Sequence, residues 1–386
     1  MRAILASAAA AFLAPFLVSD VCAEPMFLTK QYTRCTACHY SPTGGGLLTP
    51  YGQLLSHREL STTGRTAAAP AAGAETNPHG EQAFLDGALG DALGPVHLGL
   101  DIRPSYLRIN FPGGHQGMNP LMTLDLIAAA QKNGWTAYGT VGREPGNSAV
   151  RNGRTLADAA FISYEHWISY QTEKGLSIRG GRFLPAYGVR FADHTAYSRI
   201  SLDFDRNDQV YGLEVSATVG PSLVQAMISP GKAEAILHDH SHRAFSTAGR
   251  WQYDIAPRAT IVGSAFYRHS TDLDPQSGAV GGAFGVAPAS RVSIWTEVDA
   301  DLQPKTAGGR AWVVVNETAV EVYRGLWLKV SPQLRTSDAP GGSDLRRLAL
   351  AADLLPRTHW NVNVVYYRDR AFGATTSTLL TQLHLY

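Results

Sequence analysis

The most constraining feature of this sequence is a two-residue alternation of apolar and polar side chains that continues from Val96 to Tyr386, the last residue. Segments 96–103, 291–299 and 360–366 show it most clearly. Successive side chains of a β strand point to opposite faces of the sheet, so the alternation predicts strands with one apolar and one polar face. We therefore expect this whole region to be built from strands.

The lengths of the connections indicate how these strands are arranged. Short connections such as 131–134 and 220–221 alternate with longer ones such as 184–207 and 231–243. Short turns on one edge and longer loops on the other are typical of a transmembrane antiparallel β-barrel with an even number of strands. We therefore predict an all-β fold of about 16 strands, and a soluble double-sheet protein is the alternative. The predicted strands are 96–111, 120–130, 134–143, 158–171, 176–183, 208–218, 222–230, 244–254, 258–268, 279–286, 290–300, 309–316, 320–335, 344–354, 358–368 and 375–386.

Two details of this barrel can be anticipated. The chain ends on an aromatic residue, as outer-membrane barrels usually do, but Tyr386 shares a face with Gln382 and His384 instead of with Leu383. We expect a bulge in the last strand to account for this register. Four acidic residues of the strands are expected to face a polar lumen, namely Asp125, Glu165, Glu214 and Glu297.

The N-terminal residues 1–23 have the pattern of a cleaved secretory signal peptide. Arg2 supplies a positive charge, residues 3–18 are apolar, and Val21-Cys22-Ala23 offers small residues before a cleavage site. An uncleaved membrane anchor is the alternative. Cleavage would remove Cys22 and leave two cysteines, Cys35 and Cys38, which are three residues apart.

Charge and composition narrow the remaining possibilities. The chain has 33 Lys and Arg against 32 Asp and Glu, a formal net charge of +1, and so lacks the basic excess of a nucleic-acid-binding protein. Residues 61–95 are rich in Ala, Gly, Thr and Pro, which predicts a flexible linker. This linker would separate a small segment at 24–60 from the barrel at 96–386.

The small segment contains Cys35-Thr36-Ala37-Cys38-His39, a C-x-x-C-H motif. This spacing is the attachment sequence of a c-type haem. Two thiols about one helical turn apart can bond the two vinyl groups of one porphyrin, and the adjacent imidazole can bind the iron as proximal ligand. A redox-active or structural disulfide is the alternative. Export and the use of both remaining cysteines in the motif favour haem, so we predict a small helical c-type haem segment before the barrel.

The second axial ligand is harder to predict. Thr49 and Pro50 have the residue types of an N-cap and first helical position, so a helix should begin there and bring His57, near its end, over the haem. His57 is therefore the candidate distal ligand, and iron that is open or bound to water is an alternative. His194 is a second candidate, because the third long loop of general porins folds into the pore and 184–207 is the third long loop here. Four weaker candidates are His79, His97, His115 and Met118.

Two further groups have metal-binding residue types. Four aspartates in or near the 184–207 loop offer hard oxygen ligands for a cation such as Fe²⁺, although they are more simply explained as a loop tied by arginines: Asp193, Asp203, Asp205 and Asp208. The run His238-Asp239-His240-Ser241-His242 would place three imidazoles on one face of a strand, but in a surface loop it is simply polar.

The haem motif, followed by Leu48-Thr49-Pro50-Tyr51-Gly52 and then by one barrel, resembles the fused monohaem cytochrome–porins of the outer membrane, a group that includes outer-membrane iron oxidases. That family likewise has a Leu-Thr-Pro-aromatic-Gly run after its haem motif. The resemblance implies that Cys35 and Cys38 carry the haem, that His39 ligates it, and that the haem segment plugs or caps the barrel. This chain differs by its Gly44-Gly45-Gly46 insertion and by its Ala-rich linker.

The expected function is electron transfer across the outer membrane through this one haem, with a periplasmic c-type cytochrome as partner and an extracellular redox partner at the other mouth. An external donor such as Fe(II) would make the protein an oxidoreductase. Two alternatives remain: a diffusion porin whose haem segment gates or senses, and a soluble periplasmic c-type cytochrome with a β domain.

Overall fold

The computed structural model describes residues 25–62, 94–143, 161–202, 204, 208–231, 244–270, 277–302, 310–338 and 344–386. Several sequence-based predictions lie outside these residues. They are the signal peptide with Cys22, most of the predicted linker with His79, two of the loop aspartates (Asp203 and Asp205), and the histidine run at 238–242.

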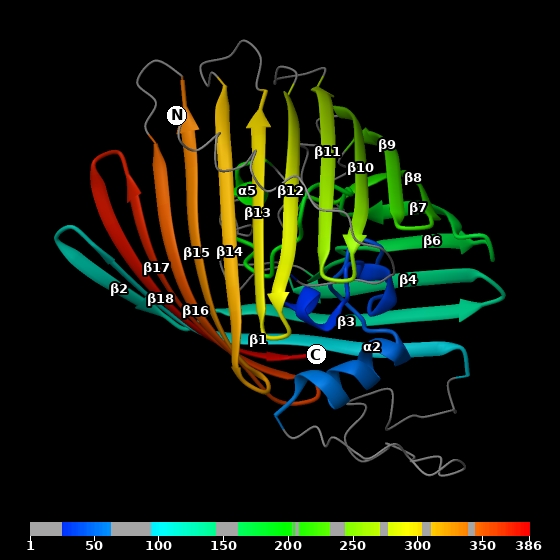
Figure 1. The fold of residues 1–386 in the computed structure, drawn as a ribbon, viewed down its shortest axis with the longest axis horizontal. Coiled ribbons are helices and arrows are strands. Elements are labelled where there is room, and N and C mark those ends of the chain that lie inside the picture. The colour runs from blue at the N-terminus through cyan, green and yellow to red at the C-terminus, as the bar shows by residue number, and fades with distance from the viewer. Residues whose placement is uncertain are drawn as a thin grey trace.

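The described strands form one antiparallel sheet that closes on itself, because the first strand pairs with the last (Figure 1). They are β1 (Val96–Phe111), β2 (Gly114–Met118), β3 (Leu121–Lys132), β4 (Trp135–Arg143), β5 (Phe161–Ile162), β6 (His166–Gln171), β7 (Leu176–Phe183), β8 (Val210–Val219), β9 (Ser222–Gly231), β10 (Ala244–Ala256), β11 (Ala259–Ser270), β12 (Ser277–Ala289), β13 (Val292–Asp301), β14 (Ala311–Tyr323), β15 (Leu326–Ser337), β16 (Leu345–Arg357), β17 (Trp360–Ala371) and β18 (Ala374–Leu385). β2 and β3 pair in turn with β1, and β5 and β6 pair in turn with β4. β2 and β3 are therefore two parts of one interrupted strand, as are β5 and β6. Counted in this way, the described segments make the predicted barrel of sixteen strands.

The alternation of side chains works as the sequence predicts, with the polar face inside. Glu214 in β8 and Glu297 in β13 are each 2% exposed, whereas their neighbours Val215 and Val298 are 45% and 39% exposed. Asp125 and Glu165 are buried in the same way. All four predicted lumen residues therefore face the interior, and Val215 and Val298 face outward.

One predicted turn, at 317–319, is wrong. β14 continues to Tyr323, and the chain reverses at Arg324-Gly325, where Gly325 has a φ of +75°. Glu317 in the predicted turn and Glu321 just after it are 6% and 3% exposed and face the lumen. In a barrel with a polar interior, a polar residue inside a strand does not mark its end.

The first predicted long loop, at 112–119, is also wrong. Pro112-Gly113 forms a two-residue turn in which Gly113 has a φ of +93°, and the chain returns immediately as β2. His115 and Met118 therefore lie on a strand, with exposed side chains. Glycine supplies this left-handed conformation without steric cost, which allows the hairpin to be tight.

No bulge accounts for the position of Tyr386. β17 and β18 pair without a shift from Trp360↔Leu385 to Ala371↔Ala374. Tyr386 therefore points inward, where its hydroxyl lies 3.5 Å from the Oγ of Ser56. The predicted bulge is wrong, and the last residue of the chain contacts the interior of the barrel.

The lumen holds two further parts of the chain, which Figure 1 shows within the curve of the sheet. The first is residues 25–62, which we term the N-terminal segment. It contains η1 (Pro25–Lys30), η2 (Cys35–Ala37), α2 (Pro50–Leu55) and η3 (Ser56–Leu60). Thr49 caps α2 by accepting a hydrogen bond from the Gly52 amide at 3.1 Å, with Pro50 in the first turn, as predicted.

The second part is residues 184–202, which we term the inward loop. It contains the short helix α5 (Tyr197–Ile200) and buries Phe191 and Tyr197 against β13, β14 and β15. The expectation that this loop folds into the pore is confirmed. Among the described helices, none is long and apolar enough to cross a membrane.

Candidate functional site

The N-terminal segment is anchored to the barrel wall by buried polar contacts on several sides. Arg34 forms an ion pair with Asp254 of β10 at 3.0 Å, and its side chain also donates to the Gly220 carbonyl. Lys30 pairs with Glu321 of β14 at 2.6 Å. Because the partners come from separate strands, the segment is held in one position across the lumen.

Further contacts come from backbone groups and from the inward loop. The indole of Trp295 donates to the Pro25 carbonyl at 2.9 Å, and the Gln252 amide donates to the Thr33 carbonyl at 2.6 Å. Arg190 of the inward loop donates to the carbonyls of Thr43 and Gly44. The N-terminal segment and the inward loop therefore contact each other inside the barrel.

The C-x-x-C-H motif is folded tightly onto the residues that follow it. The amides of Cys38 and His39 both donate to the Cys35 carbonyl, at 3.2 and 3.0 Å, which makes one turn of 3₁₀ helix. The Thr49 amide donates to the Cys38 carbonyl at 2.8 Å, and α2 begins there. A Cβ on Gly52 would lie 2.3 Å from the same carbonyl oxygen, so α2 can pack on the motif only with glycine at this position.

A cavity of about 170 Å³ lies between the N-terminal segment and the barrel wall; we term it the motif cavity. Cys38 and His39 line it from the segment, together with apolar side chains of η1, α2 and η3. β1 and β18 contribute Asp101, Arg103 and His384 from the wall. An apolar chamber with a few converging polar groups is the usual form of a cofactor site.

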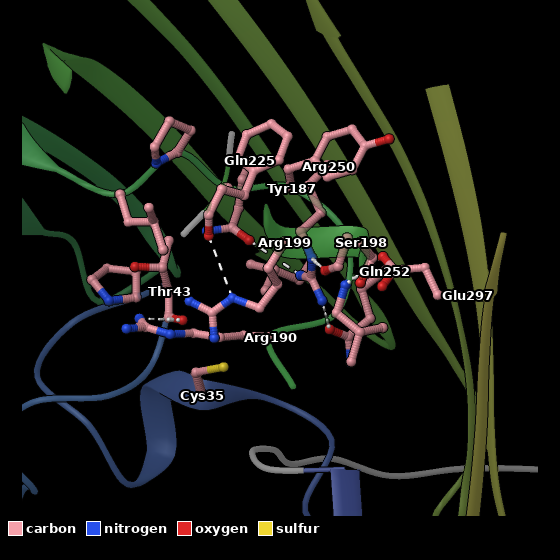
Figure 2. A pocket seen from close by; sticks show the side chains of 18 residues that line it. Cys35, Thr43, Tyr187, Arg190, Ser198, Arg199, Gln225, Arg250, Gln252 and Glu297 are labelled. Carbon is pink, nitrogen blue, oxygen red and sulfur yellow. Dashed lines mark hydrogen bonds between the residues drawn. The ribbon is translucent and has the colours of Figure 1, made fainter. Parts of the chain in front are cut away.

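Cys35 lies on the other side of η2. It lines a smaller cavity of about 50 Å³ with residues of the inward loop, among them Arg190 (Figure 2). The structure therefore brings Cys38 and His39 together in the motif cavity but not Cys35. Both cysteines are free thiols, so the described residues contain no disulfide at the motif.

The environment of the motif suits a metal-bound imidazole. Burial, with the positive charge of Arg190 nearby, lowers the pKa of His39 to about 4, so the ring is neutral at pH 7 and has a lone pair to donate. Its Nδ1 is shielded from solvent and has no hydrogen-bond partner in the described part of the chain. A buried polar atom without a partner is costly, and a bond to a metal would satisfy it. Burial also raises the pKa of the Cys38 thiol to about 12.

These observations test whether the motif fits a c-type haem. A c-type haem requires two thiols that bond its vinyl groups and a neutral imidazole that binds its iron. Cys38 and His39 already share a cavity, and Cys35 is three residues away on the same turn of helix. The residues present fit the group, provided that the Cys35 side chain turns toward the motif cavity.

The other predicted site residues lie elsewhere. His57 follows α2 as predicted, but its Nδ1 lies 3.0 Å from the hydroxyl of Thr358, and it is not among the residues that line the motif cavity. His97 packs against Tyr40 with ring centroids 5.7 Å apart. His194 also lies outside both cavities.

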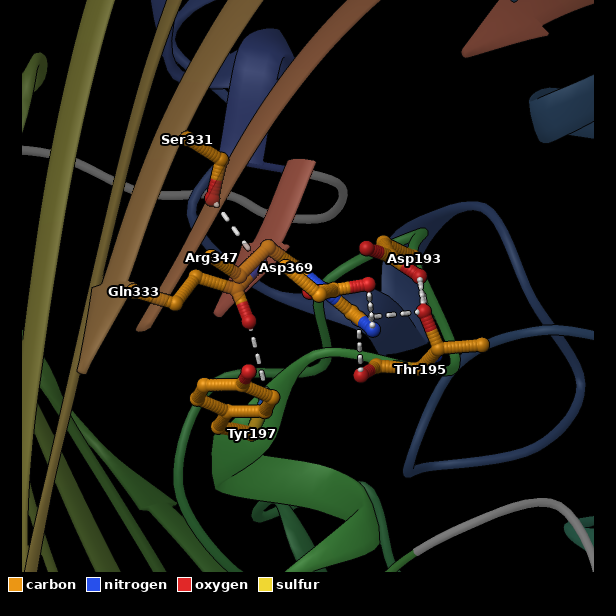
Figure 3. Close-up of polar contacts among 7 residues, drawn as sticks. All are labelled: Asp193, Thr195, Tyr197, Ser331, Gln333, Arg347 and Asp369. Carbon is orange, nitrogen blue, oxygen red and sulfur yellow. Dashed lines mark hydrogen bonds and ion pairs between the residues drawn. The ribbon is translucent and has the colours of Figure 1, made fainter. Parts of the chain in front are cut away.

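The inward loop around His194 is fixed by polar contacts to the wall (Figure 3). Arg347 of β16 pairs with Asp369 at 2.7 Å and donates to the Thr195 carbonyl at 2.8 Å. Asp193 accepts hydrogen bonds from the amide and hydroxyl of Thr195. This agrees with the tied loop that the sequence favoured; two aspartates of the alternative Fe²⁺ patch, Asp203 and Asp205, lie outside the described residues. In the described ranges, no group of three or more His, Cys, Asp or Glu side chains is arranged to hold a metal ion.

The sequence analysis missed the wall of the motif cavity. Asp101, His359 and His384 lie far apart in the sequence and belong to no motif. One signal was available: the register that puts Tyr386 on the face of His384 also turns both residues into the lumen.

Comparisons with known proteins bear on the fold. No family model and no curated protein matches the chain. Many solved structures do, including OprB of Pseudomonas putida (TM-score 0.59, 10% identity, covering 77% of this chain and 97% of that one). The outer membrane channel DcaP of Acinetobacter baumannii matches with a TM-score of 0.55 and 10% identity over 75% of this chain and 97% of that one. An anion-selective porin from Comamonas acidovorans matches with a TM-score of 0.55 and 11% identity over 75% of this chain and 99% of that one. The chain therefore has the fold of an outer-membrane porin.

Proposed function

We propose that this protein transfers electrons across the outer membrane through one covalent c-type haem held inside a plugged porin-like barrel. The observation that carries the proposal is the shared cavity of Cys38 and His39, enclosed between the N-terminal segment and the barrel wall. Cys35 and Cys38 would bind the haem covalently and His39 would ligate its iron. When bound, the group supplies one-electron Fe(III)/Fe(II) chemistry.

The position of the cavity supports a periplasmic acceptor. It is lined by the first residues of β1, by the turn residue His359 and by the terminal Tyr386, all at the end of the barrel where most connections are two-residue turns. In outer-membrane barrels the short turns face the periplasm, and the apolar outer band, about 25 Å tall, faces the lipids. A periplasmic c-type cytochrome is therefore the expected partner, and it would take the electron at this mouth.

The donor would act from the opposite, extracellular mouth. An external one-electron donor such as Fe(II) would lose one electron and become Fe(III), and the periplasmic cytochrome would gain that electron. Such a reaction would make the protein an oxidoreductase. The contacts of the N-terminal segment and the inward loop support this role, because they hold the motif in one position inside the barrel.

A liposome assay tests this function. The full chain is produced with c-type maturation, purified and placed in liposomes that enclose a soluble c-type cytochrome, and Fe(II) is added outside. We expect the enclosed cytochrome to be reduced faster than in empty liposomes or with the barrel carrying Cys35→Ser and Cys38→Ser. Equal rates in all three samples would contradict the proposal.

A diffusion porin is the second candidate function, and the comparisons favour it, since the similar structures include a channel and an anion-selective porin. The two functions differ in the lumen. A diffusion porin conducts ions in a planar lipid bilayer without any change to the N-terminal segment. An electron-transfer protein with the contacts described above remains closed until that segment is loosened.

A further inference from the structure

We propose that His384, oriented by Asp101, is the second axial ligand of the haem; this rests on the proposed function. The motif cavity has two sides, the N-terminal segment that carries His39 and the wall formed by β1 and β18. A haem bound to the segment through Cys38 and His39 would be held within reach of the other residues that line that cavity. The second ligand should therefore come from the residues that line it.

Besides the motif itself, four residues of the types that ligate haem iron line the cavity: Met26, His359, His384 and Tyr386. Met26 is 2% exposed and packs in an apolar cluster with Leu60 and Trp327, where its thioether already fills a core position. His359 occupies the turn between β16 and β17 with a φ of +65°, at the rim of the barrel. Tyr386 follows the end of β18, and its hydroxyl lies 3.5 Å from the Oγ of Ser56. Of the four, His384 is the one within a strand of the wall.

The surroundings of His384 are those of a metal ligand. Its Nε2 lies 3.3 Å from a carboxylate oxygen of Asp101 on the neighbouring strand. Asp101 is itself held by Arg103, whose Nε and Nη2 each donate to one carboxylate oxygen at 2.8 Å. A histidine that binds a metal usually has a carboxylate on its other nitrogen, which fixes the ring and raises its basicity.

The register of the last strand gives a second, independent reason. Outer-membrane barrels place aromatic residues on the outer surface, at the membrane interfaces. Here Tyr386 is instead turned inward, next to His384, with ring centroids 4.7 Å apart. The unshifted pairing of β17 with β18 places both residues inside. A ligand role for His384 explains why the strand keeps this register.

The test uses the visible spectrum of the full chain, loaded with haem and purified in detergent. We expect low-spin, six-coordinate iron in the unchanged protein. His384→Ala should convert it to high-spin iron that binds added imidazole and then regains the low-spin spectrum. His57→Ala, which removes a histidine outside the cavity, is the matched control and should leave the spectrum unchanged.

Several results would overturn the assignment. One is a low-spin spectrum that survives His384→Ala; another is high-spin iron in the unchanged protein. Conversion to high-spin iron by His57→Ala, His359→Ala or Met26→Leu, and not by His384→Ala, would assign the ligand elsewhere. Heat-modifiable migration on gels shows for each variant that the barrel has folded. If the unchanged protein carries no covalent haem at all, the proposed function fails as well, and the two failures are distinguished by the haem stain.

Asp101 is tested separately as a positioning residue. Asp101→Asn keeps the shape of the side chain but removes its charge, so the imidazole of His384 becomes a weaker donor to the iron. We expect the spectrum to remain low-spin while the reduction potential shifts upward. An unchanged potential would remove Asp101 from the proposal.

Discussion

Breaking the Arg34–Asp254 ion pair should release the N-terminal segment from the lumen. The two side chains are 7% and 2% exposed, and their closest N–O distance is 3.0 Å. Asp254→Ala leaves the Arg34 guanidinium buried beside β10 without its carboxylate. Removing one partner of a buried ion pair costs about 3–5 kcal/mol, whereas replacing both by apolar residues is often nearly neutral.

This cost sets the size of the expected effect. At about 1.4 kcal/mol for each factor of ten, the full cost would raise the population of released segment by about 10²- to 10³-fold. The Lys30–Glu321 ion pair and the Trp295 hydrogen bond still hold the segment. The measured increase in released segment should therefore be smaller than this value. Because the segment fills the lumen, its release should open the pore.

Single-channel recording in planar lipid bilayers measures that opening. We expect the unchanged protein to be mostly closed, Asp254→Ala to open often, and the double variant Arg34→Met with Asp254→Leu to return toward the closed state. The matched control is Arg346→Ala, which breaks an ion pair with Asp344 at 3.4 Å whose side chains are 65% and 43% exposed. Exposed pairs contribute about 0–1 kcal/mol, so this control should behave like the unchanged protein. If Asp254→Ala opens no more often than Arg346→Ala, the reasoning about the plug is refuted.

Three further substitutions test the local structure. Gly52→Ala should push α2 away from Cys38, destabilise the folded protein by about 1–3 kcal/mol and lower the haem stain per barrel. Gly263→Ala is the control and should have none of these effects, because no atom lies closer than 4.0 Å to the added Cβ. Thr49→Val removes the cap of α2, worth about 1 kcal/mol, and should speed hydrogen exchange at the Gly52 amide about fivefold; unchanged exchange would mean that the cap is not formed. Arg347→Ala removes the contacts to Asp369 and the Thr195 carbonyl, so backbone exchange in the inward loop should increase while that of β16 does not.

Much of the fold could be predicted because it depends on local pattern. The alternation of side chains fixes which residues of a strand face inside, and Glu214 and Glu297 are buried as predicted. The errors came from the same rule applied to polar residues. Glu317 lies in the predicted turn at 317–319, although a barrel with a polar lumen accepts this residue inside β14. Likewise, the bulge predicted from the position of Tyr386 is absent, because the last strand pairs without a shift and Tyr386 points inward.

The site could be predicted only where it is contiguous in the sequence. Cys38 and His39 are adjacent, and they share the motif cavity. The opposite wall combines Asp101 from the first strand of the barrel with His384 from the last, which meet because β1 pairs with β18. Barrel closure joins the first and last strands, and no spacing along the sequence encodes that contact. The choice of His57 followed sequence proximity, which says little about contacts across a closed barrel.

The most direct test of the account is a haem stain of outer-membrane fractions run boiled and unboiled on one gel, from cells competent for c-type maturation. The account predicts one haem-positive band that shifts on boiling and loses its stain, but not its shift, when Cys35 and Cys38 are both replaced by Ser. A band of this size that shifts on boiling but carries no haem in the unchanged protein would contradict it and leave the diffusion porin as the better description.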